Sequence, residues 1–229
     1  MAAKDWQENI DAVVNARMTE AGFLFIDHNF KYVKKLNEVV DFVVQLKQNR
    51  LWSVVGEIEL APTVGIVQRE ITELAIALMG TKQVSHLDYA FHSNDLFWVF
   101  YKVLTPHLDR RPWTLTPNSN QETIEFVVDE VVAAVSAKVE EFQQQFDSIE
   151  AILEDMLAPG VIRARMWKTY YIPVTHILCG RYDEALLYVE NLCQDFVAKD
   201  RLKYNKTYVV FRTNVQAEIA RRRSEGDKV

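Results

Sequence analysis

Two histidines and an aspartate form the first constellation with the residue types of a metal site. His86, Asp88 and His92 fall on one side of a predicted strand over residues 86–92, because positions two and four apart share a face. Imidazole and carboxylate groups are ligands for zinc or iron. His86 and His92 are roughly 20 Å apart at the rise of a strand, too far for one ion to bridge. We therefore interpret these residues as the polar side of an amphipathic strand and predict no metal and no cofactor.

A pair of carboxylates, Glu57 and Glu59, shares one face of another predicted strand. Paired carboxylates serve as general acid and base or hold a divalent cation. A small metal-assisted hydrolase that combines them with the strand of His86 is therefore one hypothesis for the chain. No lysine follows them as a nuclease core requires, no glycine-rich loop cradles phosphate, and no serine or cysteine lies in a nucleophile elbow. We favour solvated or partner-facing roles for both glutamates.

The loop around residues 109–113 has the composition of a binding element. Arg110, Arg111 and Trp113 belong to the residue types that are enriched at interface hot spots, and we expect the loop to be exposed. The alternative is that Trp113 folds back over the sheet edge and leaves the arginines solvated. With Glu57 and Glu59, these three residues are the predicted partner-binding set.

The formal charge of −6 is unevenly distributed along the 229 residues. Residues 199–229 hold nine Lys or Arg against four acids, a balance of +5, so the remaining residues carry −11. An acidic body disfavours nonspecific binding to nucleic acid and favours a protein partner with a basic surface. The basic tail, with arginines at 221–223, leaves a nucleic-acid contact as an alternative to a solvated helix end.

The sequence indicates a cytoplasmic protein. Its apolar stretches are shorter than the roughly 20 residues that span a bilayer, and its first residues lack the apolar segment of a secretory signal. Cys179 and Cys193 are far from any CxxC spacing and are expected to be small buried side chains. The oligomeric state cannot be predicted.

Hydrophobic periodicity predicts helices packed on an antiparallel sheet. Alternating apolar residues predict strands over 23–34, 38–48, 51–61 and 86–92, with a further strand over 96–103. Spacings of three and four predict helices over 4–21 and over 64–79, the latter capped by Thr63. A capping box at Ser119–Glu122 predicts a long helix that reaches residue 158.

The last seventy residues are predicted to be wholly helical, over 161–179, 182–198 and 204–223, with Pro173 kinking the first of these or marking its start. We place a boundary near Pro159, between an α+β domain of residues 1–158 and a helical subdomain of residues 161–229 that packs on it. The predicted class is therefore α+β, with an antiparallel sheet of about four or five strands flanked by helices and followed by an all-helical block.

Two resemblances extend this interpretation. Residues 178–186, Leu-Cys-Gly-Arg-Tyr-Asp-Glu-Ala-Leu, resemble the centre of a tetratricopeptide repeat, which implies a helical hairpin at Gly180. The first 157 residues, with Gly22-Phe23 after a helix, a meander and a later helix, resemble an uncharacterised bacterial family known only as a domain of unknown function. Some domains of this build are immunity or accessory proteins beside bacterial toxins, which implies a protein-binding role. We therefore expect a non-enzymatic protein that binds a basic protein partner.

Overall fold

The structure is a computed structural model that describes residues 3–27, 31–50, 56–80, 100–103, 113–158, 167–198 and 206–226. The chain divides into two compact units, each discontinuous in sequence. The first consists of Met1–Ile66 with Phe100–Gln144, and the second of Val67–Val99 with Gln145–Val229. Residues 145–158 thus belong to the second unit, whereas the boundary predicted near Pro159 assigns them to the α+β domain.

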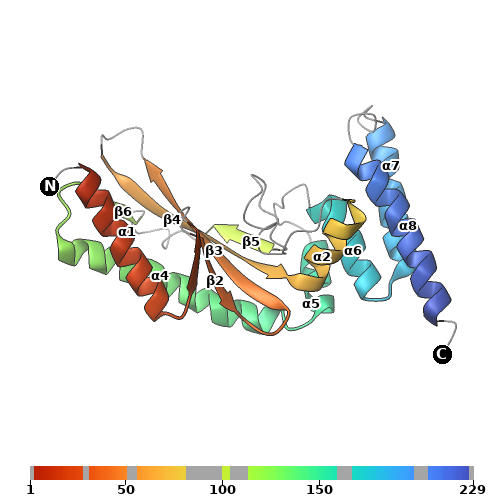
Figure 1. Ribbon diagram of the computed structural model, residues 1–229, viewed down its shortest axis with the longest axis horizontal. Coiled ribbons are helices and arrows are strands. Elements are labelled where there is room, and N and C mark those ends of the chain that lie inside the picture. Colours follow the sequence, from red (N-terminus) through yellow and green to blue (C-terminus); the bar gives the residue numbers. More distant parts are fainter. Residues whose placement is uncertain are drawn as a thin grey trace. The chain divides into compact units, whose positions relative to one another are not determined.

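The first unit is built on an antiparallel sheet (Figure 1). Its strands lie in the order β1-β2-β3-β4-β5, and β6 pairs with β4. The bounds are β1 Leu24–Asp27, β2 Lys31–Lys35, β3 Val40–Arg50, β4 Ile58–Gln68, β5 Phe100–Val103 and β6 Thr114–Leu115. The predicted α+β class, with helices beside the sheet and a helical block after it, is confirmed.

One face of the sheet is covered by two helices, α1 (Ala3–Glu20) and α4 (Gln121–Gln145). Phe42 of β3 is fully buried, and its ring lies 5.5 Å from that of Phe142 on α4. Tyr32 of β2 shares this face of the sheet, and its hydroxyl donates a hydrogen bond to Asn15 of α1. The opposite face of β3 is also buried, because Val43 has no exposed surface.

The two helices pack against each other and run in the same direction at their contact. Asn9 donates a side-chain hydrogen bond to Gln121 over 2.8 Å, and Arg17 donates one to Asp129 over 2.9 Å. From the first hydrogen-bonded pair to the second, the position increases by eight residues on each helix, as it does in parallel helices. The core stripe of α4 consists of Ile124, Val128, Val131, Val135, Val139 and Phe142.

Apart from the last two residues of β4, the regular elements described in the second unit are helical. They are α2 Arg69–Leu78, α5 Ile149–Leu157, a π-helical turn over Trp167–Tyr171, α6 Ile172–Leu178, α7 Tyr182–Ala198 and α8 Lys206–Gly226. Pro173 lies in the first turn of α6, which confirms that it marks a helix start. Gly180, with φ of 72°, joins α6 to α7, so the helical hairpin implied there is present.

The helices α7 and α8 run antiparallel around an aromatic cluster. The rings of Phe196 and Tyr208 meet edge to face at 4.8 Å, and Tyr208 donates its hydroxyl to the carbonyl of Val189 over 2.7 Å. Burial raises the pKa of Tyr208, which keeps this hydroxyl a donor. Asn214 of α8 donates to the carbonyl of Leu78 over 2.9 Å and thereby caps the end of α2.

Three predicted elements differ from the structure. Residues 23–34 are two antiparallel strands, since Leu24 pairs with Val33, and not one strand. The strand predicted to end before Thr63 continues to Gln68, whose side chain, in place of that of Thr63, caps α2 by accepting from the amide of Ile71 over 2.6 Å. The helix predicted to reach residue 158 breaks after Gln145, and Ser148 caps the new helix α5.

The cap of α4 is also shifted by one residue. Asn120 accepts from the amide and from the hydroxyl of Thr123, each over 2.8 Å, whereas Ser119 accepts from the amide of Thr116. The predicted strand over 86–92 lies outside the described residues, and within 96–103 the described part, β5, is a strand.

Candidate partner-binding surface

The outward side of α4 presents an exposed aromatic ring among carboxylates. Phe126 is 62% exposed, although it lies in a helix whose other side forms the core. Positions one, three and four residues away are its neighbours on the helix surface or along the chain. Four acids occupy such positions: Glu122, Glu125, Asp129 and Glu130. We call Phe126 and these four acids the acidic α4 face.

Two of these carboxylates are held in place by hydrogen bonds. Gln121 donates to Glu125 over 2.7 Å, and the guanidinium of Arg17 donates to Asp129 over 2.9 Å. A hydrogen bond to Glu20, together with the charge of Asp129, raises the pKa of Arg17. Glu122 lies in the first turn of α4, where the helix dipole stabilises a negative charge. Hydrogen bonds within the first unit therefore hold part of this face in place.

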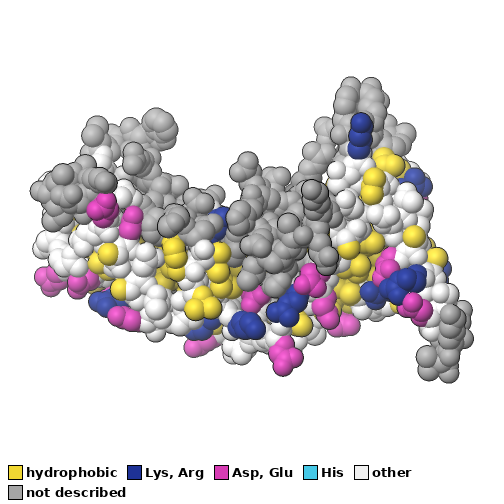
Figure 2. Space-filling model, viewed as in Figure 1, with side chains coloured by type: hydrophobic (Ala, Val, Ile, Leu, Met, Phe, Trp, Pro, Cys, Tyr) yellow, Lys and Arg dark blue, Asp and Glu magenta, His cyan; other side chains and the backbone are white. Residues whose placement is uncertain are grey.

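Negative charge is concentrated on the first unit. Its residues include 16 acids and 11 Lys or Arg, a formal balance of −5, whereas the second unit has 16 acids and 15 Lys or Arg, a balance of −1. The helix α4 alone carries six acids against a single lysine, Lys138. Figure 2 shows acidic side chains along the margin at lower left, where Figure 1 draws α1 and α4.

Of the two glutamates predicted from the strand pattern, Glu57 directly precedes β4 and Glu59 is its second residue, and both are half-buried. Glu59 is paired with Thr114 of β6 in the sheet. Gly56, just before β4, has a φ of 98° and lies so close to Pro117 that an added Cβ would stand 2.8 Å from its ring. Gly56 and Glu57 thus lead into β4 close to the turn that precedes α4.

The expected exposure of Trp113 is wrong. Its side chain is only 7% exposed, and its carbonyl accepts a hydrogen bond from the amide of Leu60 over 2.8 Å. A tryptophan buried beside β4 offers little surface to a partner, as the alternative interpretation of this loop anticipated. Arg110 and Arg111 lie outside the described residues.

The edge strand β1 is a second exposed apolar feature of the first unit. Leu24, Phe25 and Ile26 are 69%, 41% and 39% exposed. Among the described strands, β1 pairs only with β2. An exposed apolar edge is a site of pairing with another chain or of aggregation.

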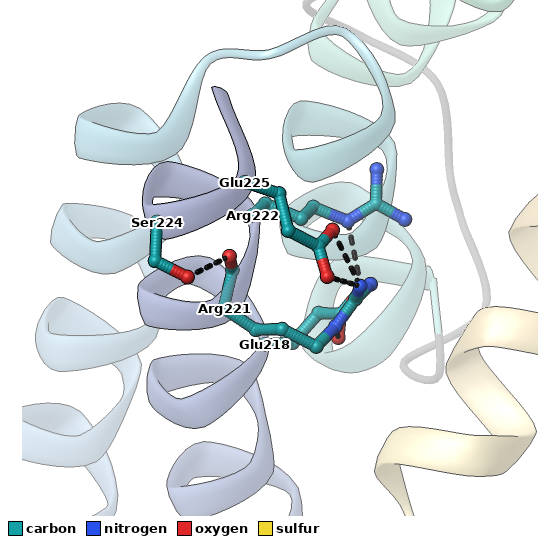
Figure 3. A network of polar contacts seen from close by, with 5 residues as sticks. All are labelled: Glu218, Arg221, Arg222, Ser224 and Glu225. Carbon is teal, nitrogen blue, oxygen red and sulfur yellow. Dashed lines mark hydrogen bonds and ion pairs between the residues drawn. The ribbon is translucent and has the colours of Figure 1, made fainter. Parts of the chain in front are cut away.

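The basic end of the chain is ion-paired within the protein (Figure 3). Arg221 pairs with Glu218 and Glu225, and Arg222 also pairs with Glu218, at distances of 2.7 to 2.8 Å. The hydrogen bond from Arg221 is the main reason that the pKa of Glu218 falls to about 2. Arg223 pairs with Asp183 on α7 over 2.6 Å. These arginines are compensated by acids on α8 and α7, which reduces the charge that they offer to nucleic acid.

The described residues contain no group of three or more His, Cys, Asp or Glu side chains able to hold a metal ion. His86, Asp88 and His92 lie outside them. Both cysteines are free. Cys193 is buried as predicted, whereas Cys179 is half-buried, and burial raises its pKa to about 11, which makes it a poor nucleophile. Among the described helices, none has the length and apolar character to cross a membrane.

Comparisons with known proteins add no assignment. The chain matches no protein-family model, no curated protein and no solved structure.

Proposed function

We propose that the chain is a non-enzymatic protein that binds another protein through the acidic α4 face, and that this partner carries a basic surface. The observation that carries the proposal is the exposed ring of Phe126 among four carboxylates on a helix with a net negative charge. Aromatic residues supply binding energy at interfaces, and complementary charge speeds and orients the encounter. The role that we propose for it is that of a toxin-neutralising or assembly factor.

Two alternatives have less support. The metal-assisted hydrolase depends on His86, Asp88 and His92, and elemental analysis of protein purified without added metal would test it. A nucleic-acid contact through the tail depends on arginines that are ion-paired along α8. Deletion of residues 220–229 would test that contact.

The proposal can be tested by capture with a matched pair of charge reversals. Glu122 and Glu140 are both exposed on α4 and stand 18 residues apart, which is five helical turns. They therefore point the same way, roughly 27 Å apart along the axis. Glu122→Lys and Glu140→Lys change the net charge equally, but only the first reverses a charge beside Phe126.

Immobilised full-length chain should capture a basic protein from an extract of its source organism at low salt, and the yield should fall as salt rises. We expect Glu122→Lys to reduce the yield about tenfold and Glu140→Lys to leave it within about twofold. Repeated failure to capture any protein at low salt, or equal losses for both variants, would overturn the proposal.

A further inference from the structure

We infer that Phe126 is the anchor of the acidic α4 face and that the partner receives its ring in an apolar pocket rimmed by Lys or Arg. This inference rests on the proposed function and specifies how the surface is used. A large aromatic side chain that is 62% exposed on a well-packed helix contributes little to the fold. Burying it in a partner removes apolar surface from water, which is the main source of binding energy at interface hot spots.

A comparison within the chain shows what distinguishes this position. Leu187 of α7 is 63% exposed and also has acids nearby on its helix, at 183, 184 and 190. There, however, Asp183 pairs with Arg223, and Glu190 accepts two hydrogen bonds from the guanidinium of Arg212. The charge around Leu187 is therefore largely compensated within the protein.

The charge around Phe126 is less compensated. Asp129 forms an ion pair with Arg17, but Glu125 accepts a hydrogen bond from the neutral side-chain amide of Gln121. Among the described residues, neither Glu122 nor Glu125 has a lysine or arginine partner. A surface that covers the ring of Phe126 also removes water from these carboxylates, and this is unfavourable unless the covering surface supplies cations. The rim of the partner's pocket must therefore be basic.

The same charges argue against a second copy of the chain as the occupant. The first unit carries a formal charge of −5, so two acidic α4 faces placed against each other would bring like charges together. A partner of opposite charge is the occupant that fits both the ring and its surroundings.

Binding kinetics separate the ring from the charges around it. The probe is the protein captured by the wild-type chain in the experiment above, purified and passed over immobilised full-length variants. We expect Phe126→Ala to raise the dissociation rate about 30-fold and to leave the association rate nearly unchanged, because the ring acts after the encounter. Glu122→Gln should lower the association rate and its salt dependence, with a smaller effect on dissociation.

The matched control is Leu187→Ala, which removes an equally exposed aliphatic side chain and should change neither rate. Phe126→Leu should retain part of the affinity, and circular dichroism should show that each variant remains folded. A photo-crosslinker placed at Phe126 (Phe126→p-benzoylphenylalanine) should attach to apolar residues of the partner that have Lys or Arg nearby.

Two outcomes overturn the inference. One is binding by Phe126→Ala within about twofold of wild type while Glu122→Lys still loses the partner, which leaves the proposed function intact. The other is cross-linking from residue 126 to a flat or acidic surface of the partner. If every variant bound the partner as the wild type does, both the inference and the proposed function would be overturned.

Discussion

The packing of α4 on the sheet can be tested by a double-mutant cycle between Phe42 and Phe142. Both rings are buried, at 0% and 1% exposure, with centroids 5.5 Å apart and planes inclined by 60°. Such a pair contributes about 0.5–1.5 kcal/mol beyond the burial of its area. We therefore expect Phe42→Leu and Phe142→Leu to be non-additive.

Each single change to leucine keeps an apolar side chain but removes part of the ring volume, so each should lower the free energy of unfolding by about 1–2 kcal/mol. In the double variant the aromatic contact is lost only once. Its free energy of unfolding should therefore fall by about 0.5–1.5 kcal/mol less than the sum of the single effects.

Urea unfolding followed by tryptophan fluorescence measures these differences, because Trp6 and Trp113 are buried in the first unit. The denaturant dependence must be the same in all variants for the comparison to hold. As a control, Phe142→Leu combined with Phe196→Leu joins changes in different units and should be additive. A coupling between Phe42 and Phe142 below about 0.3 kcal/mol would refute the packing described for α4.

Further predictions concern a helix cap, a buried histidine and the sheet edge. Ser148→Ala removes the acceptor for the amide of Ala151 at the start of α5, and should cost about 1 kcal/mol of stability in urea unfolding, with Ser148→Asp restoring it. Burial lowers the pKa of His176 in the folded protein below its ordinary value of 6.5. As the pH drops below 6.5, this histidine is therefore protonated more readily in the unfolded chain than in the folded one, and the stability should fall. His176→Leu should flatten this part of the profile of melting temperature against pH, and an unchanged profile would contradict the assignment. Leu24→Lys should leave stability within about 0.5 kcal/mol and reduce light scattering on storage, whereas Leu187→Lys should not change the scattering.

Long periodic segments made the helices predictable. The helices expected over 4–21 and 182–198 are Ala3–Glu20 and Tyr182–Ala198 in the structure, because several turns of regular spacing leave one consistent buried stripe. The caps were harder to predict. Serine and asparagine are both common N-cap residues, so Ser119 and Asn120 are both candidates. Only the backbone geometry of the turn decides that Asn120 accepts the hydrogen bond from the amide of Thr123.

The end of β4 shows why local signals mislead when tertiary context intervenes. The sequence predicts a strand that ends at residue 61, directly before Pro62, which lacks an amide donor. In the sheet, β6 pairs with β4 at Ile58 and Glu59, and β5 begins its pairing at Thr63, so Pro62 falls between the two paired stretches. The residue without an amide donor thus lies between the stretch of β4 that pairs with β6 and the stretch that pairs with β5. The strand can therefore continue through the proline.

The candidate surface was only partly predictable. An acidic body and a basic partner follow from composition, but Trp113 was chosen as the aromatic contact from its residue type, whereas the structure buries it. Phe126 was within reach of the sequence, because it lies two residues from both Ile124 and Val128 of the core stripe and therefore about 200° away from them around the helix. An aromatic residue on the polar side of an amphipathic helix was the signal that pointed to it.

The exposure of Phe126 is a consequence of how α4 packs. Rotating the helix to bury this ring would move Ile124 and Val128, which are 1% and 0% exposed, away from the sheet, at a cost of about 1.5–3 kcal/mol for each side chain. The fold therefore holds the backbone that carries the ring in one conformation, with the ring facing outward. An anchor that is already ordered loses less conformational entropy when it binds. A polar residue would serve the fold equally well here, so Phe126→Gln should leave the unfolding free energy within about 0.5 kcal/mol of wild type. A larger loss would mean that the ring stabilises the unit, and its exposure would then no longer argue for a partner.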